Sequence, residues 1–212
     1  MTTITPGETD CLVVIDLQND FMPGGALAVP EGDAVVPTIN RLAARFRHVV
    51  ATQDWHPAGH SSFASAHPGR SPFETIEAAY GEQTLWPDHC IQGTSGAAFH
   101  DDFNPERVEL VLRKGFRPAI DSYSAFTEND RSTTTGLEGY LRARGFKRLF
   151  FVGLATDFCV RWSVEDARTA GFQAVLIEDA CRAIDLEGSR TAALSAMKAV
   201  GTQIARSSDL GV

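Results

Sequence analysis

The sequence predicts an α/β fold built on a parallel sheet, because strand-like and helix-like patterns alternate along it. The strand-like segments are short, continuously apolar runs, which are typical of strands buried on both faces. The segments between them are amphipathic with a helical period. A chain of 212 residues, 43% of them hydrophobic, is long enough for one domain with a sizeable core. We therefore expect residues 1–212 to form a single domain.

The first half of this domain is expected to contain two strands and one helix. CLVVID at 11–16 and HVVATQD at 48–54 are the strands, and DAVVPTINRLAARF at 33–46 is the helix between them. The interval at about 55–107 then breaks the rhythm, because it is rich in Pro, Gly, Ser and His. Long irregular insertions in compact domains are often functional, although the segment 64–84 inside this one matches no pattern.

The second half returns to the alternation of strand and helix. The expected strands are VELVLRK at 108–114, RLFFVGL at 148–154, FQAVLIED at 172–179 and the shorter TQIA at 202–205. The expected helices are the amphipathic segments at 135–145, 156–171 and 187–201.

The charge and cysteine content of the sequence limit the classes of molecule that this protein is expected to bind. The formal net charge is -8 and no basic run is present, so neither a nucleic acid nor an anionic membrane is expected to bind. The first residues resemble no secretory signal, and no apolar run approaches the roughly 18 residues of a membrane span. Four scattered cysteines form no C-x-x-C pair and are expected to be free thiols. These observations predict a cytoplasmic protein with a small-molecule ligand, and they leave homo-oligomer formation open.

Ionisable residues follow four of the predicted strands. Asp16, Asp54 and Lys114 end three of them, and Cys159 comes shortly after the fourth. Ligands of open α/β sheets bind outside the carboxyl ends of the strands, so these side chains are expected to share one site.

Cys159 is the candidate nucleophile of this site. If Thr156 caps the helix that starts there, Cys159 lies in the first turn, where the positive end of the helix dipole favours a thiolate. The N–H groups of Ala155 and Cys159 could then receive the oxyanion formed when sulfur attacks a carbonyl. Taken alone, a single cysteine is more often a small buried hydrophobe. Asp16 and Lys114 shift the balance, because with the thiol they make up a base, a cation and a nucleophile.

A second group of residues indicates a metal site. Asp54 and His56 are two residues apart, which puts a carboxylate and an imidazole on the same side of an extended segment. His60 and His89 are both candidates for a third ligand. The alternative is that these histidines cap turns in a loop rich in proline.

Five segments together resemble nicotinamidases of the isochorismatase-like cysteine hydrolase superfamily. They are VVIDLQNDFMPGG at 13–25, TQDWHPAGHSSF at 52–63, LWPDHCIQGTSGAAFH at 85–100, RKG at 113–115 and GLATDFCVRWSVEDA at 153–167. The resemblance implies three layers, αβα, around a six-stranded parallel sheet. It also implies hydrolysis of nicotinamide to nicotinate and ammonia in NAD salvage, with activity on pyrazinamide.

The resemblance further assigns residues by position. It implies a catalytic triad of Asp16, Lys114 and Cys159, and a divalent ion, zinc favoured over iron or manganese, on Asp54, His56 and His89. The residue matching His60 binds metal in some members and not in others. Phe21, Trp86 and Tyr123 match the walls of the ring pocket, together with Leu154 and Ala155, and the bond between the last two is expected to be cis.

Two alternatives stay open on sequence alone. One is a different amidohydrolase of the superfamily, acting on a ureido or carbamoyl compound without a metal for substrate binding. The other is a non-catalytic α/β protein that binds a small ligand, although VGLATDF lacks the glycine spacing that cradles a pyrophosphate.

Overall fold

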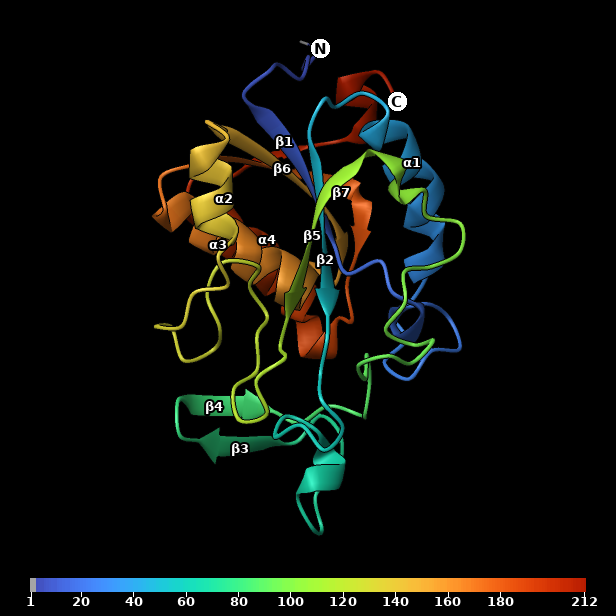
Figure 1. Ribbon diagram of the computed structural model, residues 1–212, viewed down its shortest axis with the longest axis vertical. Coiled ribbons are helices and arrows are strands. Elements are labelled where there is room, and N and C mark those ends of the chain that lie inside the picture. The colour runs from blue at the N-terminus through green and yellow to red at the C-terminus, as the bar shows by residue number, and fades with distance from the viewer. Residues whose placement is uncertain (1–2) are drawn as a thin grey trace.

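The computed structural model describes residues 3–212 and has a six-stranded sheet between two layers of helices (Figure 1). Its strands lie in the order β5-β2-β1-β6-β7-β8, and all neighbours are parallel. They are β1 (Asp10–Ile15), β2 (Val49–Asp54), β5 (Val108–Lys114), β6 (Arg148–Leu154), β7 (Gln173–Arg182) and β8 (Gln203–Ala205). The predicted three-layer α/β fold is confirmed.

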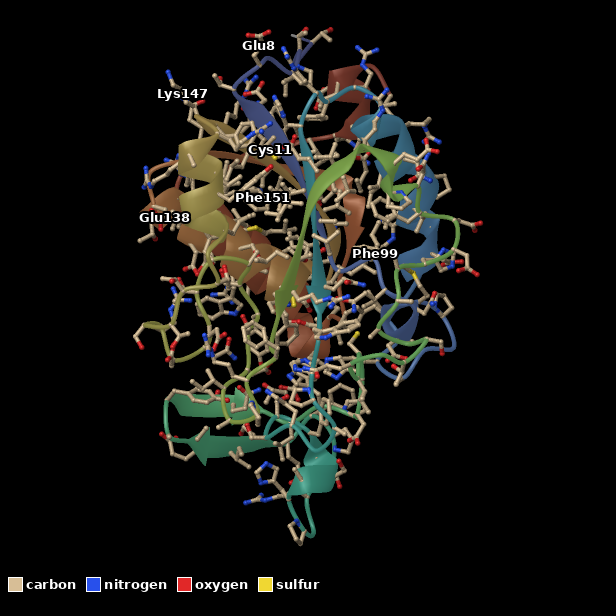
Figure 2. The ribbon with its side chains drawn as sticks, viewed as in Figure 1. Glu8, Cys11, Phe99, Glu138, Lys147 and Phe151 are labelled. Carbon is tan, nitrogen blue, oxygen red and sulfur yellow. The ribbon has the colours of Figure 1, made fainter. Side chains whose placement is uncertain are left out.

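Helices cover both faces of this sheet. α1 (Val36–Ala43) lies on one face, and α2 (Leu137–Ala143), α3 (Arg161–Thr169) and α4 (Ser189–Ala199) lie on the other (Figure 1). Strand β1 shows why residues 11–15 are apolar: Leu12 and Val14 belong to the core on the α1 side, and Val13 belongs to the opposite core. Figure 2 shows Cys11 and Phe151 on the side of α2, and Phe99 on the side of α1.

Short helical turns mark many of the connections. The 3-10 turns are Asn19–Phe21, Gly32–Val35, Ala64–Ala66, Pro105–Arg107, Leu186–Gly188 and Ser207–Leu210, and Thr156–Val160 is a π turn. Three of these turns occupy the starts of predicted helices, so that α1, α3 and α4 are shorter than the amphipathic pattern indicated. Strand β7 runs three residues beyond its predicted end at 179.

The insertion contains a hairpin that the sequence did not predict. β3 (Thr75–Ala78) and β4 (Gly81–Thr84) pair antiparallel, and the turn between them brings Gly81 to a φ of 109°, which favours glycine. In Figure 1 this hairpin lies beyond the ends of β2 and β5 that carry the arrowheads. The insertion therefore projects over the edge of the sheet where the ionisable residues gather.

Two further expectations can be compared with the described residues. Between residues 3 and 212, no helix combines the length and apolar character needed to cross a bilayer. Cys11, Cys90, Cys159 and Cys181 are all buried free thiols.

Candidate active site

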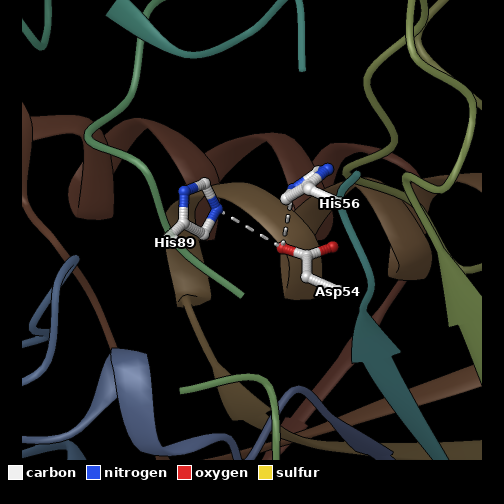
Figure 3. Close-up of side chains that lie close together, drawn as sticks. All are labelled: Asp54, His56 and His89. Carbon is white, nitrogen blue, oxygen red and sulfur yellow. Dashed lines mark ion pairs between the residues drawn. The ribbon is translucent and has the colours of Figure 1, made fainter. Parts of the chain in front are cut away.

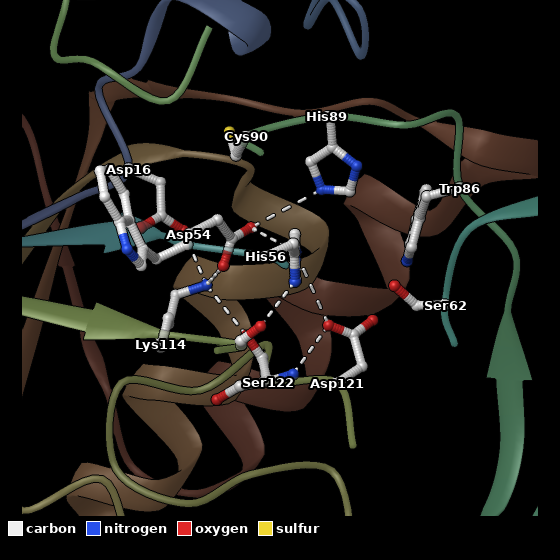
Figure 4. A network of polar contacts seen from close by, with 12 residues as sticks. Asp16, Asp54, His56, Ser62, Trp86, His89, Cys90, Lys114, Asp121 and Ser122 are labelled. Carbon is white, nitrogen blue, oxygen red and sulfur yellow. Dashed lines mark hydrogen bonds and ion pairs between the residues drawn. The ribbon is translucent and has the colours of Figure 1, made fainter. Parts of the chain in front are cut away.

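The carboxyl ends of four neighbouring strands bring the ionisable residues together. Asp54 and Lys114 end β2 and β5 and are partners in the register of these two strands. Asp16 directly follows β1, with a φ of 49° that aspartate tolerates better than most residues. Cys159 lies in the π turn Thr156–Val160, which follows β6. The sheet thus fixes Asp54 and Lys114 through its register, and Figure 4 shows Asp16 beside them.

Lys114 is the centre of this group and is fully buried. Its Nζ forms ion pairs with Asp54 Oδ1 and with Asp16 Oδ2, the latter at 2.9 Å. The same ammonium lies 3.3 Å from Cys159 Sγ and donates to the carbonyl oxygen of Ser122 at 3.0 Å. Burial alone would lower the pKa of Lys114, but the two carboxylates outweigh it and raise that pKa well above its ordinary value. The lysine therefore stays charged.

Asp16 has the properties of a base. Thr52 donates its hydroxyl to Oδ1 at 2.5 Å. The other oxygen, Oδ2, pairs with Lys114 Nζ at 2.9 Å and has no further partner among residues 3–212. Burial raises the pKa of Asp16 to about 6, against the opposing effect of Lys114. At neutral pH this carboxylate is ionised and able to accept a proton.

The local structure around Cys159 differs from the one predicted. Thr156 does not cap a helix: the turn starts with it, Ala155 precedes the turn, and no side chain caps the N-terminus. Burial raises the pKa of the Cys159 thiol well above its ordinary value, against the opposing effect of Lys114. The expectation that Thr156 caps a helix is wrong, and the role of Cys159 as nucleophile stays a prediction.

The backbone before Cys159 has the conformation that the resemblance implied. The peptide bond between Leu154 and Ala155 is cis. The N–H of Ala155 has no backbone or side-chain acceptor among residues 3–212, so it is available to a ligand. The oxyanion role of the Ala155 and Cys159 N–H groups stays a prediction.

Asp54, His56 and His89 converge on one point (Figure 3). The Nε2 atoms of both histidines lie 3.8 Å from Asp54 Oδ2. Each Nδ1 donates to a backbone carbonyl at 2.8 Å, that of Gly115 for His56 and that of Pro87 for His89. Both Nε2 lone pairs are thereby directed at the carboxylate, an arrangement that fits a divalent cation.

The surroundings shift the pKa values of the two histidines in opposite directions. Burial lowers the pKa of His56 to about 4, so its ring is neutral. At His89 burial acts in the same direction, but Asp54 outweighs it and raises the pKa.

His60 lies beside this set of ligands rather than within it. Its ring is 4.5 Å from that of His56. Its Nε2 lies 2.8 Å and 3.2 Å from the carbonyl oxygens of Arg117 and Ile120, so this nitrogen carries the hydrogen. Its Nδ1 accepts from Ser62. In this geometry His60 has no free lone pair for a metal.

A largely apolar pocket joins the Cys159 thiol to His89 and Asp54. It is lined by Phe21, Leu27, Asp54, Trp86, His89, Asp121, Tyr123, Ala155, Phe158, Cys159 and Ile184. Of the residues expected in its wall, Leu154 is absent, since its side chain is buried in the core on the α1 side. Sequence reasoning missed Leu27, Asp121, Phe158 and Ile184.

Aromatic rings form one wall of this pocket. Phe158 meets Trp86 edge to face with ring centroids 4.8 Å apart, and it packs against Tyr123 at 5.6 Å. The indole N–H of Trp86 donates to the Tyr123 hydroxyl at 3.2 Å. The only sequence feature that could have predicted Phe158 as a pocket residue is its position next to Cys159.

Comparisons with known proteins agree with this geometry. Residues 10–209 match the family model described as the isochorismatase domain. The chain belongs to the isochorismatase family. Within that family it is 52% identical to the nicotinamidase of Acinetobacter baylyi over 91% of this chain and 90% of that protein.

Two solved isochorismatase-family structures extend the likeness to three dimensions. The nicotinamidase and pyrazinamidase of Acinetobacter baumanii superposes with a TM-score of 0.95 at 54% identity, covering 96% of this chain and 99% of that one. The pyrazinamidase of Pyrococcus horikoshii, solved in complex with zinc, superposes with a TM-score of 0.76 at 37% identity, covering 93% and 99%.

Proposed function

We propose that this protein hydrolyses nicotinamide to nicotinate and ammonia, and that it also accepts pyrazinamide. The observation on which this rests is the Lys114 ammonium between Cys159 Sγ, at 3.3 Å, and the Asp16 carboxylate, at 2.9 Å. Cys159 lines a pocket walled by aromatic rings, and Lys114 links it to the buried Asp16, which supports a nucleophile with a base beside it. The similarity to nicotinamidases supports the choice of substrate.

The pocket would orient the substrate before any bond changes. Phe21, Trp86 and Phe158 offer apolar faces to a flat heteroaromatic ring. Asp54, His56 and His89 would hold one divalent ion, and the related pyrazinamidase solved with zinc supports zinc for it. When bound, the ion would act as a Lewis acid that anchors the pyridine nitrogen. The carboxamide carbon would then face Cys159.

In the first half of the reaction, Asp16 removes the proton from the Cys159 thiol as sulfur bonds to the amide carbon. Lys114 stabilises the negative charge on both partners. The carbonyl oxygen becomes an oxyanion, which the N–H groups of Ala155 and Cys159 receive. Protonated Asp16 then gives its proton to the amide nitrogen, the carbon–nitrogen bond breaks, and ammonia leaves a thioester on Cys159.

In the second half, Asp16 takes a proton from water as the water oxygen attacks the thioester. The carbon–sulfur bond breaks, and the proton held by Asp16 returns to the sulfur. Nicotinate leaves and the resting thiol is restored, which agrees with the raised pKa of Cys159. Nicotinate formed in this way would feed NAD salvage.

The test is ammonia release by the purified protein with nicotinamide and pyrazinamide as substrates. Turnover of both is the expected result. If the protein left both untouched but hydrolysed a ureido or carbamoyl amide, the proposed substrate would be wrong while the cysteine chemistry would stand.

A further inference from the structure

Gln83, on the unpredicted hairpin, is almost fully buried, with 1% of its surface exposed. Its amide oxygen accepts from the Tyr80 hydroxyl at 3.0 Å and from the Asn129 side-chain amide at 3.2 Å. These two donors fix which way the amide points. Its nitrogen therefore faces the candidate site, where it donates to Asp121 Oδ2 at 2.8 Å.

Asp121 is a buried carboxylate that the proposed reaction does not use. Its Oδ1 accepts from the N–H of Ser122 at 2.8 Å and lies 4.0 Å from His56 Nε2 (Figure 4). No lysine or arginine among residues 3–212 forms an ion pair with it. Because Nδ1 of His56 donates to Gly115, the Nε2 lone pair and the Asp121 oxygen face each other. Two such electron-rich atoms repel each other unless a cation lies near both.

The charge balance of the site leads to the same conclusion. Three buried carboxylates share it with one buried ammonium: Asp16, Asp54 and Asp121 with Lys114. With neutral histidines, these groups leave two negative charges in excess. Buried charge is costly unless it is neutralised, and one divalent ion neutralises this excess in full. Without Asp121, the same ion would leave a net positive charge.

We propose that Asp121 is a second carboxylate of the metal centre, which retains the divalent ion electrostatically, and that Gln83 is the residue that positions it. The inference rests on the proposed function, since the ion belongs to that proposal. It also gives the β3–β4 hairpin a role, because that hairpin carries Gln83 to Asp121.

The experiment measures zinc affinity by competition with a chelating dye, in the wild type and in Asp121→Asn, with no substrate present. Loss of a carboxylate beside the ligands is expected to raise the zinc dissociation constant about tenfold or more. Gln83→Met, which keeps the side-chain length but removes the donor to Asp121, is expected to weaken binding by a smaller factor. Saturating zinc is expected to restore most of the turnover of Asp121→Asn.

Asp166→Asn is the matched control. The substitution removes another buried carboxylate, because Asp166 lies on α3 and pairs with Arg131. This variant is expected to bind zinc as the wild type does. Thermal unfolding reports whether each variant is folded. If Asp121→Asn does not fold, the zinc affinity of Gln83→Met tests the inference instead. Wild-type affinity in both site variants would overturn the inference and leave the metal centre intact. A wild-type protein that binds no divalent ion would overturn the metal centre as well.

Discussion

The edge of the sheet and the 55–107 insertion form two sides of one pocket, but they are held by different means. At the sheet edge, Asp54 and Lys114 are placed by the continuous register of β2 and β5 within the six-stranded sheet. The insertion has only a two-stranded hairpin and isolated bridges such as that of His56 with Ile91, and side-chain bonds add to them. Asp20 Oδ2, for example, accepts from the N–H of Cys90 at 2.7 Å and so fixes the loop that carries His89.

The difference has a chemical meaning. Proton transfer and nucleophilic attack need atoms placed within a few tenths of an ångström, and a strand ladder supplies this rigidity. Orientation of a ring depends on walls and ligands that can differ among related enzymes. Changes at the sheet edge are therefore expected to abolish turnover, and changes on the insertion side to weaken ion or substrate binding first.

The largest effect is expected at the nucleophile. Cys159→Ala should lower kcat by roughly 10⁴-fold or more, since no other group can form the thioester. Ammonia release and metal content are measured on one sample, and the metal content should not change. Cys11→Ala, which alters a buried thiol in β1 away from the site, should retain turnover. Retained turnover in Cys159→Ala would refute the covalent route.

Lys114→Met removes the buried positive charge from the sheet edge. Two buried carboxylates lose their only lysine, so we expect the free energy of unfolding to fall by about 3 kcal/mol. Loss of this charge beside the sulfur should also lower kcat by about 10²-fold to 10³-fold. Urea unfolding and steady-state rates check both effects. The exposed Lys147→Met is the control, and equal stability of the two variants would contradict the assigned role.

Gly115→Ala tests the contact between the sheet edge and a metal ligand. A Cβ at this position would lie 2.5 Å from Cε1 of His56, so the ring would have to move. We expect the zinc dissociation constant to rise about tenfold. Gly145→Ala has a similar positive φ of 75° but open space around it, and should cost stability without changing zinc affinity. Equal zinc affinities in the two variants would show that the contact between the added Cβ at position 115 and the His56 ring does not affect zinc binding.

Tyr123→Phe is expected to have the smallest effect. Its hydroxyl accepts from Trp86 and Gln83, and loss of these bonds loosens the aromatic wall. One hydrogen bond contributes about 1 kcal/mol, so KM for nicotinamide should rise about fivefold with kcat nearly unchanged. Tyr140→Phe removes a hydroxyl that bonds Glu109 at the surface and is the control. A fall in kcat with constant KM would place Tyr123 in the chemistry instead.

The sequence predicted the residues at the sheet edge well and the structure of the insertion poorly, and both outcomes have physical reasons. Asp16, Asp54 and Lys114 could be grouped because the carboxyl ends of parallel strands share one edge. The β3–β4 hairpin was missed because TIEA and GEQT are too polar to read as strands. Asp121 was missed because its place depends on Gln83, 38 residues away in the chain. The helix cap expected at Thr156 was wrong because a π turn starts there, which the local sequence pattern did not indicate.

The most direct test of the account compares nicotinamide with benzamide, which lacks the ring nitrogen, before and after the ion is removed. Ammonia release is measured for both amides on the same preparation, and zinc is then restored. If the insertion side orients the ring and the sheet edge does the chemistry, removal should lower kcat/KM for nicotinamide about 100-fold or more and leave that for benzamide unchanged. An equal loss for both amides, or no loss for either, would contradict this division of roles.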